Sequence, residues 1–188
     1  KFDGSNWTVY NESNSGLPDP DNEVRALAID RSGNIWIGTW SGLAKFDGSN
    51  WTVYNTSNSD LPHNNIGALA VDGNDNIWIG TNGRGLARFD GTYWSVFNES
   101  NSGLPSNYVC ALAIDGSNVW IGTCGGLAKF DGTNWTVYNT SNSGMPDNQV
   151  SALATDGSNI WIATEWGGLT KYDGTNWTVY NTTNSGMP

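Results

Sequence analysis

The chain has 188 residues, of which only 14% are charged, and its formal net charge is −10. An acidic surface that is poor in lysine and arginine argues against nucleic acid and anionic membrane surfaces as partners. No apolar run approaches the roughly 20 residues that a membrane-spanning helix needs, so we expect no membrane insertion.

A tetrapeptide of a basic residue, an aromatic residue, aspartate and glycine occurs five times along the chain. Its copies lie at residues 1–4, 45–48, 88–91, 129–132 and 171–174, so successive starts are 44, 43, 41 and 42 residues apart. An internal period of this size indicates a repeat architecture, because each unit buries its apolar faces against its neighbours.

One repeat unit, residues 109–139, shows what each copy contains. Four short runs rich in β-branched and aromatic residues lie at 109–114, 118–123, 127–132 and 134–139. Asp-Gly and Gly-Gly turns separate them, and no helical period is present. We therefore expect four strands, A to D, in an antiparallel meander. A longer loop leads to the next strand A.

Four-stranded units repeated about every 42 residues predict the blades of a β-propeller. The fold class is all-β, with alanines of strand A nearest the axis and tryptophans of strands B and D between blades. A β-solenoid is the alternative, but its coils are usually shorter and lack hairpin turns. We expect one propeller domain or propeller fragment over residues 1–188, with a half blade at 1–11 and complete blades at about 24–55, 66–98, 109–139 and 150–181.

The half blade matters because a propeller closes most securely when one blade is built from both chain ends. Residues 1–11 supply strands C and D only, and the sequence stops at Pro188, just before the next strand A. We expect either a longer parent chain or self-association of two chains into a ring of about eight blades.

The repeat resembles a known family in several motifs. Asn34–Thr39 (NIWIGT) is followed by Gly42-Leu43, then by Phe46-Asp47-Gly48 and Trp51, and the loops contain Gly-Leu-Pro as at Gly16–Pro18. This pattern resembles the two-component regulator propeller repeat. The resemblance implies an extracellular or periplasmic sensor propeller that binds ligands such as oligosaccharides. The copies are unusually alike, which indicates recent amplification or design.

The positions where the copies differ are the best candidates for a function of this chain. They cluster after strand B and at the start of strand A, and antiparallel strands bring both places to one end of every blade. An aromatic and guanidinium surface for a glycan or peptide is predicted there, from Trp40, Arg84, Trp166, Arg25 and Tyr108. The competing interpretation is neutral variation at loop tips, which would leave a purely structural repeat protein with no ligand of its own.

No set of catalytic residues stands out, so we expect no enzyme. The single histidine, His63, lies in a loop where the sibling repeats have Asp147 or Ser106. The aspartates lie mostly in Asp-Gly turns, where accepting backbone hydrogen bonds explains them. A propeller hydrolase or lyase would need carboxylates or histidines gathered on one face.

Two acidic segments and a pair of cysteines each have a structural and a functional interpretation. Asp72–Asn76 and Asp19–Glu23 are acidic enough for calcium, but neither has the distal glutamate of a helix–loop–helix site. We therefore expect hairpin turns and no cofactor. Cys110 begins strand A and Cys124 follows strand B of the same blade, so they are either free thiols or a cross-strand disulfide of an oxidising compartment.

Overall fold

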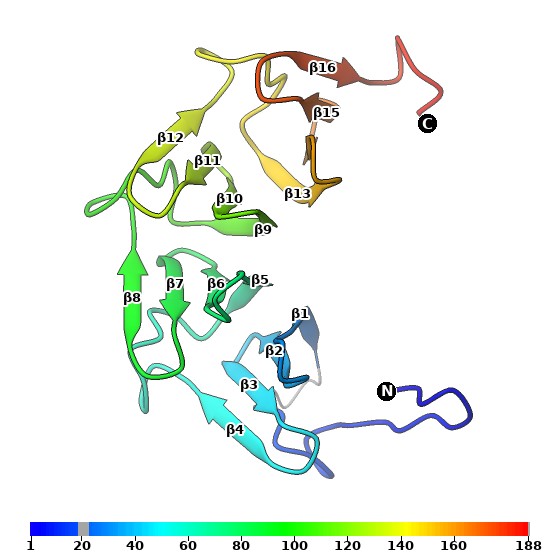
Figure 1. Cartoon of the computed structure of the whole chain (residues 1–188), viewed down its shortest axis with the longest axis vertical. Helices are drawn as coiled ribbons and strands as arrows, with labels where there is room; N and C mark the ends of the chain where they lie inside the picture. Colours follow the sequence, from blue (N-terminus) through cyan, green and yellow to red (C-terminus); the bar gives the residue numbers. More distant parts are fainter. Residues whose placement is uncertain (19–22, 188) are drawn as a thin grey trace.

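The computed structural model describes residues 1–18 and 23–187. Within these ranges the secondary structure is entirely β, in four antiparallel sheets of four strands each. The sheets stand side by side along an arc, with the first strand of each sheet toward its centre and the last strand outside (Figure 1). The prediction of a β-propeller with four-stranded blades is thus confirmed.

Each blade is a meander whose strands pair in sequence order. Blade 1 contains β1 (Val24–Ile29), β2 (Ile35–Thr39), β3 (Leu43–Phe46) and β4 (Trp51–Tyr54). Blade 2 contains β5 (Ile66–Val71), β6 (Ile77–Thr81), β7 (Gly85–Phe89) and β8 (Trp94–Phe97). Blade 3 contains β9 (Val109–Asp115), β10 (Asn118–Thr123), β11 (Gly126–Phe130) and β12 (Trp135–Tyr138). Blade 4 contains β13 (Val150–Thr155), β14 (Ile160–Thr164), β15 (Gly168–Tyr172) and β16 (Trp177–Tyr180).

The core lies between the blades, because the second and third strands of each blade are apolar on both faces. Between blades 1 and 2, Trp36 and Leu61 pack against Ile77 and Phe89, and all four side chains are buried. The same arrangement recurs between blades 2 and 3 and between blades 3 and 4. Each repeat therefore completes the core of its neighbour, as the sequence period predicts.

A glycine in the second strand sets how closely two blades approach. A Cβ atom at Gly38, Gly80 or Gly122 would lie 2.5–2.6 Å from a methyl group of Ile66, Val109 or Val150 in the following blade. Real Cβ atoms do not make contacts that short, so the packing between blades requires glycine there. Blade 4 has Ala163 at the equivalent position.

An aspartate ties the turn between the first two strands to the interblade core. Asp72 accepts hydrogen bonds from the backbone N–H groups of Asn74 and Asn76, and from the indole N–H of Trp78 at 2.9 Å. Burial pushes the pKa of Asp72 up, but these bonds and that of the Asn76 side chain outweigh it and lower the pKa. This is the structural role that the sequence indicated for the turn aspartates.

The N-terminal segment forms one bridge, Phe2 with Trp7, in place of two regular strands. A two-stranded ribbon with no inner neighbours is at best marginally stable. The segment still covers part of blade 1, because Tyr10 and Leu17 pack onto a cluster that includes Phe46. It therefore stands where the outer strands of a preceding blade would stand.

Candidate functional site

A β-bulge occurs at the same place in every blade, where the first strand begins to pair with the second. The register shifts between Val24 and Ala26 in blade 1, and at equivalent places in the other three blades. The residues at the bulge are Arg25, Gly67, Cys110 and Ser151. A bulge re-aims the side chain of the extra residue, and in this chain the bulged residue differs in every blade.

The four bulged residues meet in one cavity of about 230 Å³. Asn82, Gln149, Val150 and Glu165 also line it, so all four blades contribute. We call this cavity the axial pocket, because the four bulged residues that line it lie on the first strands, at the centre of the arc (Figure 1). The predicted convergence of the variable positions at one end of the blades is therefore what the structure contains.

The axial pocket has charges of both signs. Arg25 supplies a guanidinium group and Glu165 a carboxylate, and both lie close enough to influence the Cys110 thiol electrostatically. The remaining polar lining consists of the amides of Asn82 and Gln149 and the hydroxyl of Ser151. Such a lining can donate and accept hydrogen bonds from several directions at once.

Arg25 is held by two neighbours in its own blade. Its guanidinium carbon lies 4.5 Å from the centre of the Trp40 ring, a cation–π contact. Its Nη1 atom lies 3.9 Å from a carboxylate oxygen of Glu23. The structure thus brings together two of the five residues predicted for the site, Arg25 and Trp40.

The other predicted residues lie around the same end without entering the axial pocket. Tyr108 pairs with Asn82 across the seam between blades 2 and 3 and is 55% exposed. Trp166 is 82% exposed, and its backbone N–H donates to Asp147. Arg84 is exposed in the turn between β6 and β7. Tyr108, Trp166 and Arg84 do not line the axial pocket.

Sequence reasoning missed most of the lining of the axial pocket. Gly67, Ser151 and Gln149 stand in the same variable stretch that pointed to Arg25, and Asn82 and Glu165 stand in the variable stretch after strand B. The signal was therefore present. The prediction favoured the aromatic and charged residues instead. The bulge that turns position 25 and its equivalents inward cannot be predicted from the alternation of apolar and polar residues alone.

The two cysteines are neighbours, and both are free thiols in this structure. Cys110 lies in β9 and Cys124 directly follows β10, and their sulfur atoms are 3.8 Å apart. Burial, with Cys124 as the second cause, raises the pKa of Cys110 to about 11. A thiol with so high a pKa is protonated at neutral pH, which makes Cys110 a poor nucleophile.

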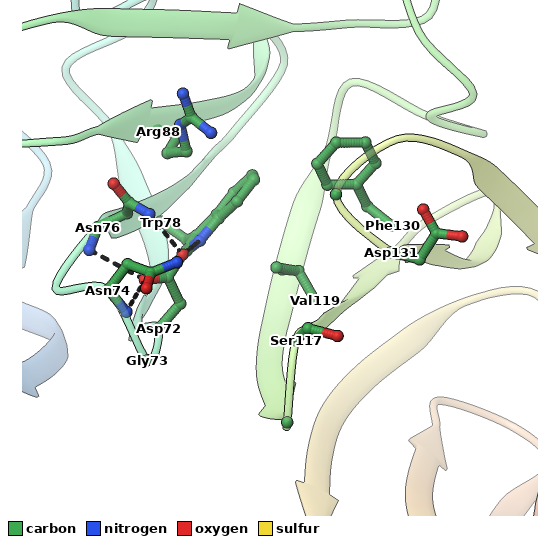
Figure 2. A pocket seen from close by; sticks show the side chains of 12 residues that line it. Asp72, Gly73, Asn74, Asn76, Trp78, Arg88, Ser117, Val119, Phe130 and Asp131 are labelled. Atoms are coloured by element: carbon green, nitrogen blue, oxygen red, sulfur yellow. Dashed lines mark hydrogen bonds between the residues drawn. The ribbon is translucent and has the colours of Figure 1, made fainter.

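A second cavity of about 420 Å³ lies at the opposite end, between blades 2 and 3. Figure 2 shows Trp78 and Arg88 facing Phe130 and Asp131 across it. Asp131 accepts backbone hydrogen bonds from its own turn, as Asp72 does. These carboxylates are therefore committed to turns and are poorly placed for acid–base catalysis.

The calcium interpretation gains no support at Asp72, whose oxygens face N–H donors. Among the described residues, no group of three or more histidines, cysteines or carboxylates is placed to hold a metal ion. Four residues of the other acidic segment, 19–22, lie outside the described ranges. His63 accepts a hydrogen bond from the N–H of Asn65 at its Nδ1 atom, within its own loop.

Comparison with known proteins supports the repeat assignment. The family model described as two component regulator propeller matches residues 18–41, 60–83 and 103–125. Each match covers a loop and the first two strands of one blade. No curated protein matches the chain in sequence. The described part of the chain contains no helix that could cross a membrane.

Solved structures with the same fold include three that differ in role. The extracellular domain of a hybrid two-component system from B. thetaiotaomicron is 24% identical over 86% of this chain, with a TM-score of 0.74. PorZ, a surface component of the type-IX secretion system of Porphyromonas gingivalis, is 19% identical over 98%, with a TM-score of 0.72. Virginiamycin B lyase from Staphylococcus aureus is 14% identical over 93%, with a TM-score of 0.69.

This chain spans 25%, 31% and 62% of the lengths of those three proteins. At such identities the likeness establishes the fold. The family match adds that three repeats carry the motifs of the two-component regulator propeller model. The chain is a β-propeller, and three of its repeats match the two-component regulator propeller model.

Proposed function

We propose that the chain is a non-enzymatic binding module that takes a glycan or a short peptide at the axial pocket. The observation that carries the proposal is the meeting of four different bulged residues, one from each blade, in that pocket. Variation at a loop tip costs little, but these residues stand within paired strands next to the buried interblade contacts. Their diversity in otherwise similar copies favours selection for recognition.

The chemistry of the pocket suits a ligand with several hydrogen-bonding groups and at least one charge. Arg25 can receive a carboxylate or another anion, while Glu165 and the amides can bind hydroxyl or amide groups. Trp40 and Tyr108 are about half exposed and provide aromatic surface beside the pocket. Sugars and peptides both use such a combination of aromatic faces and polar groups.

A binding role fits the chain better than catalysis. The thiol of Cys110 is protonated at neutral pH, and the turn carboxylates are occupied by N–H donors. One structural neighbour is a lyase, so the fold itself does not decide the question. The family match and the sensor neighbours favour a sensor-like module that works outside the cytoplasm, extracellular or periplasmic.

The test is binding of the folded 188-residue chain to a glycan array and a peptide panel. We expect hits that are lost in Arg25→Ala and weakened at least tenfold in Trp40→Ala, because each removes a direct contact at the pocket. Tyr93→Asn is the matched control, since Tyr93 is an exposed aromatic at the opposite end and the other repeats have asparagine there. Hits that all three variants retain would contradict the proposed site.

The second candidate is a purely structural repeat with no ligand of its own. It is favoured by the near identity of the copies outside the variable stretches. An absence of any hit on either panel, with the chain shown to be folded, would support it over the binding module.

A further inference from the structure

The two ends of the arc expose apolar side chains that the interior blades bury. On blade 1, Val24 is 44% exposed, whereas its equivalents Ile66, Val109 and Val150 are fully buried. Leu27 and Ile29, on the same side of β1, are 62% and 65% exposed. We call these three residues the entry face, because in blades 2 to 4 the corresponding side receives the preceding blade.

Blade 4 exposes the opposite half of the same interface. Trp161 is only partly buried, although its equivalents Trp36, Trp78 and Trp120 are 2–3% exposed. Ala152 and Ala154 of β13 are exposed on the same side. Met187 is 38% exposed, whereas Met145 in the preceding loop is 3% exposed. We call these four residues the exit face.

The exit face and the entry face are complementary, because three interior interfaces already join one to the other. Each interior interface packs a tryptophan of the second strand and a loop leucine or methionine against the following blade. The two faces therefore fit each other through contacts that the molecule makes repeatedly. This continuity with an existing interface argues for a further copy of the chain as the partner.

The N-terminal segment already covers the outer part of the surface of blade 1 on which a preceding blade would pack. The ring of Tyr10 lies 5.5 Å from Phe46 and 5.6 Å from Trp51. In the interior, Tyr54 makes the same two contacts with blade 2, at 5.5 and 5.8 Å. The segment thus imitates the outer strands of a preceding blade but leaves the entry face exposed.

The sequence provides a replacement for that segment. Residues 1–18 and 171–188 differ at five of their 18 positions, and Tyr10 and Leu17 correspond to Tyr180 and Met187. Blade 4 of a second copy could therefore repeat the contacts of residues 1–18 on blade 1. Its inner strands would add cover for the entry face, which residues 1–18 cannot give.

We propose that two copies of the chain associate head to tail, blade 4 of each displacing residues 1–18 of the other, into a closed ring of eight blades. The two contacts between the copies are equivalent by twofold symmetry, so a substitution changes the free energy of association at both contacts. The arc in Figure 1 has its two exposed ends on the same open side, as this closure requires.

Ala163 limits the strength of the association. Glycine at this position lets the next blade approach in the three interior interfaces, where a Cβ would lie 2.5–2.6 Å from a methyl group. In the proposed ring the Cβ of Ala163 meets Val24 of the other copy. We therefore expect weak dimerisation, visible only at high concentration, and a strong gain when the methyl group is removed.

The experiment is light scattering of the 188-residue chain over a wide range of concentration, up to about 1 mM. We expect a mass that rises from that of one copy, 20.3 kDa, toward that of two. Ala163→Gly should tighten the dimer about a hundredfold, which is about tenfold for each of two contacts. Leu27→Arg in that background should return the protein to a monomer, and Tyr93→Arg, at an exposed site away from both faces, should not.

Leu17→Asp tests the displacement step. It loosens residues 1–18 without touching either face, so we expect it to raise the dimer fraction. A lower or unchanged fraction would contradict the displacement. A 20.3 kDa mass for Ala163→Gly at every concentration would overturn the proposal. Masses that grow beyond two copies would also overturn it, because they indicate open head-to-tail chains.

Discussion

Blades 3 and 4 have the same tetrapeptide, Asp-Gly-Ser-Asn, between their first two strands, yet it folds differently in each. In blade 4, Asp156 accepts hydrogen bonds from the N–H groups of Ser158 and Asn159 and from the indole of Trp161. In blade 3, Asp115 instead pairs with Asn118 as the last rung of the strand ladder.

The two turns differ in whether the tryptophan that follows the tetrapeptide has a hydrogen-bond partner. Trp161 has its indole N–H 3.0 Å from Asp156. Trp120 is 3% exposed, and its indole nitrogen has no hydrogen-bond partner among the described residues. Blade 3 thus gains one ladder pair and lacks the hydrogen bond between indole and carboxylate that blade 4 forms.

The residue before the tetrapeptide helps to explain the difference. Thr155 in blade 4 accepts a hydrogen bond from the N–H of Gly157 through its hydroxyl, which supports the carboxylate-capped turn. Blade 3 has Ile114 at that position, and it packs against the core between blades 2 and 3. The comparison teaches that one tetrapeptide can form two turns, and that the residue before it makes a local hydrogen bond in one blade and a core contact in the other.

The largest expected effect sharpens the contrast between an interior blade and an end blade. Gly122→Ala should lower the free energy of unfolding by about 3 kcal/mol, because the new Cβ would lie 2.5 Å from a methyl group of Val150. The reverse change in blade 4, Ala163→Gly, should cost no more than about 1 kcal/mol in the monomer. Urea unfolding measures both, and equal losses would contradict the role given to the interior glycine.

The next effect distinguishes the two kinds of turn. Asp72→Ala leaves the indole N–H of Trp78 buried without its acceptor, so stability should fall by about 2 kcal/mol. Asp115→Ala removes no such bond and should stay within about 0.5 kcal/mol of the parent. Thermal unfolding of the two variants side by side tests this, and a large loss for Asp115→Ala would show that its carboxylate anchors the turn after all.

The smallest effect concerns Thr170, where blades 1 to 3 have alanine. Its hydroxyl is fully buried and has no partner among the described residues. Thr170→Val keeps the shape and removes the unsatisfied group, so we expect a gain of about 1 kcal/mol in urea unfolding. The matched change Ala128→Thr in blade 3 should be destabilising, and a gain there would contradict the explanation.

Much of the fold could be predicted from the repeat because its information is local. Short apolar runs, Asp-Gly turns and a fixed period define four strands per unit, and units that cannot bury their faces alone must stack. The end of the blade where the copies differ also followed from strand direction. The residues that line the axial pocket did not follow, since only Arg25 among them was predicted as a ligand contact.

The sequence by itself therefore determined a propeller of four-stranded blades and the end on which its variable residues gather. Only the tertiary structure decided that Arg25, Gly67, Cys110 and Ser151 sit on bulges and share a pocket, and that one Asp-Gly-Ser-Asn turn differs from another. The physical reason is that a bulge and a turn type depend on register between strands and on contacts with the next blade. The contacts with the next blade join residues far apart in the chain, and no local pattern encodes them.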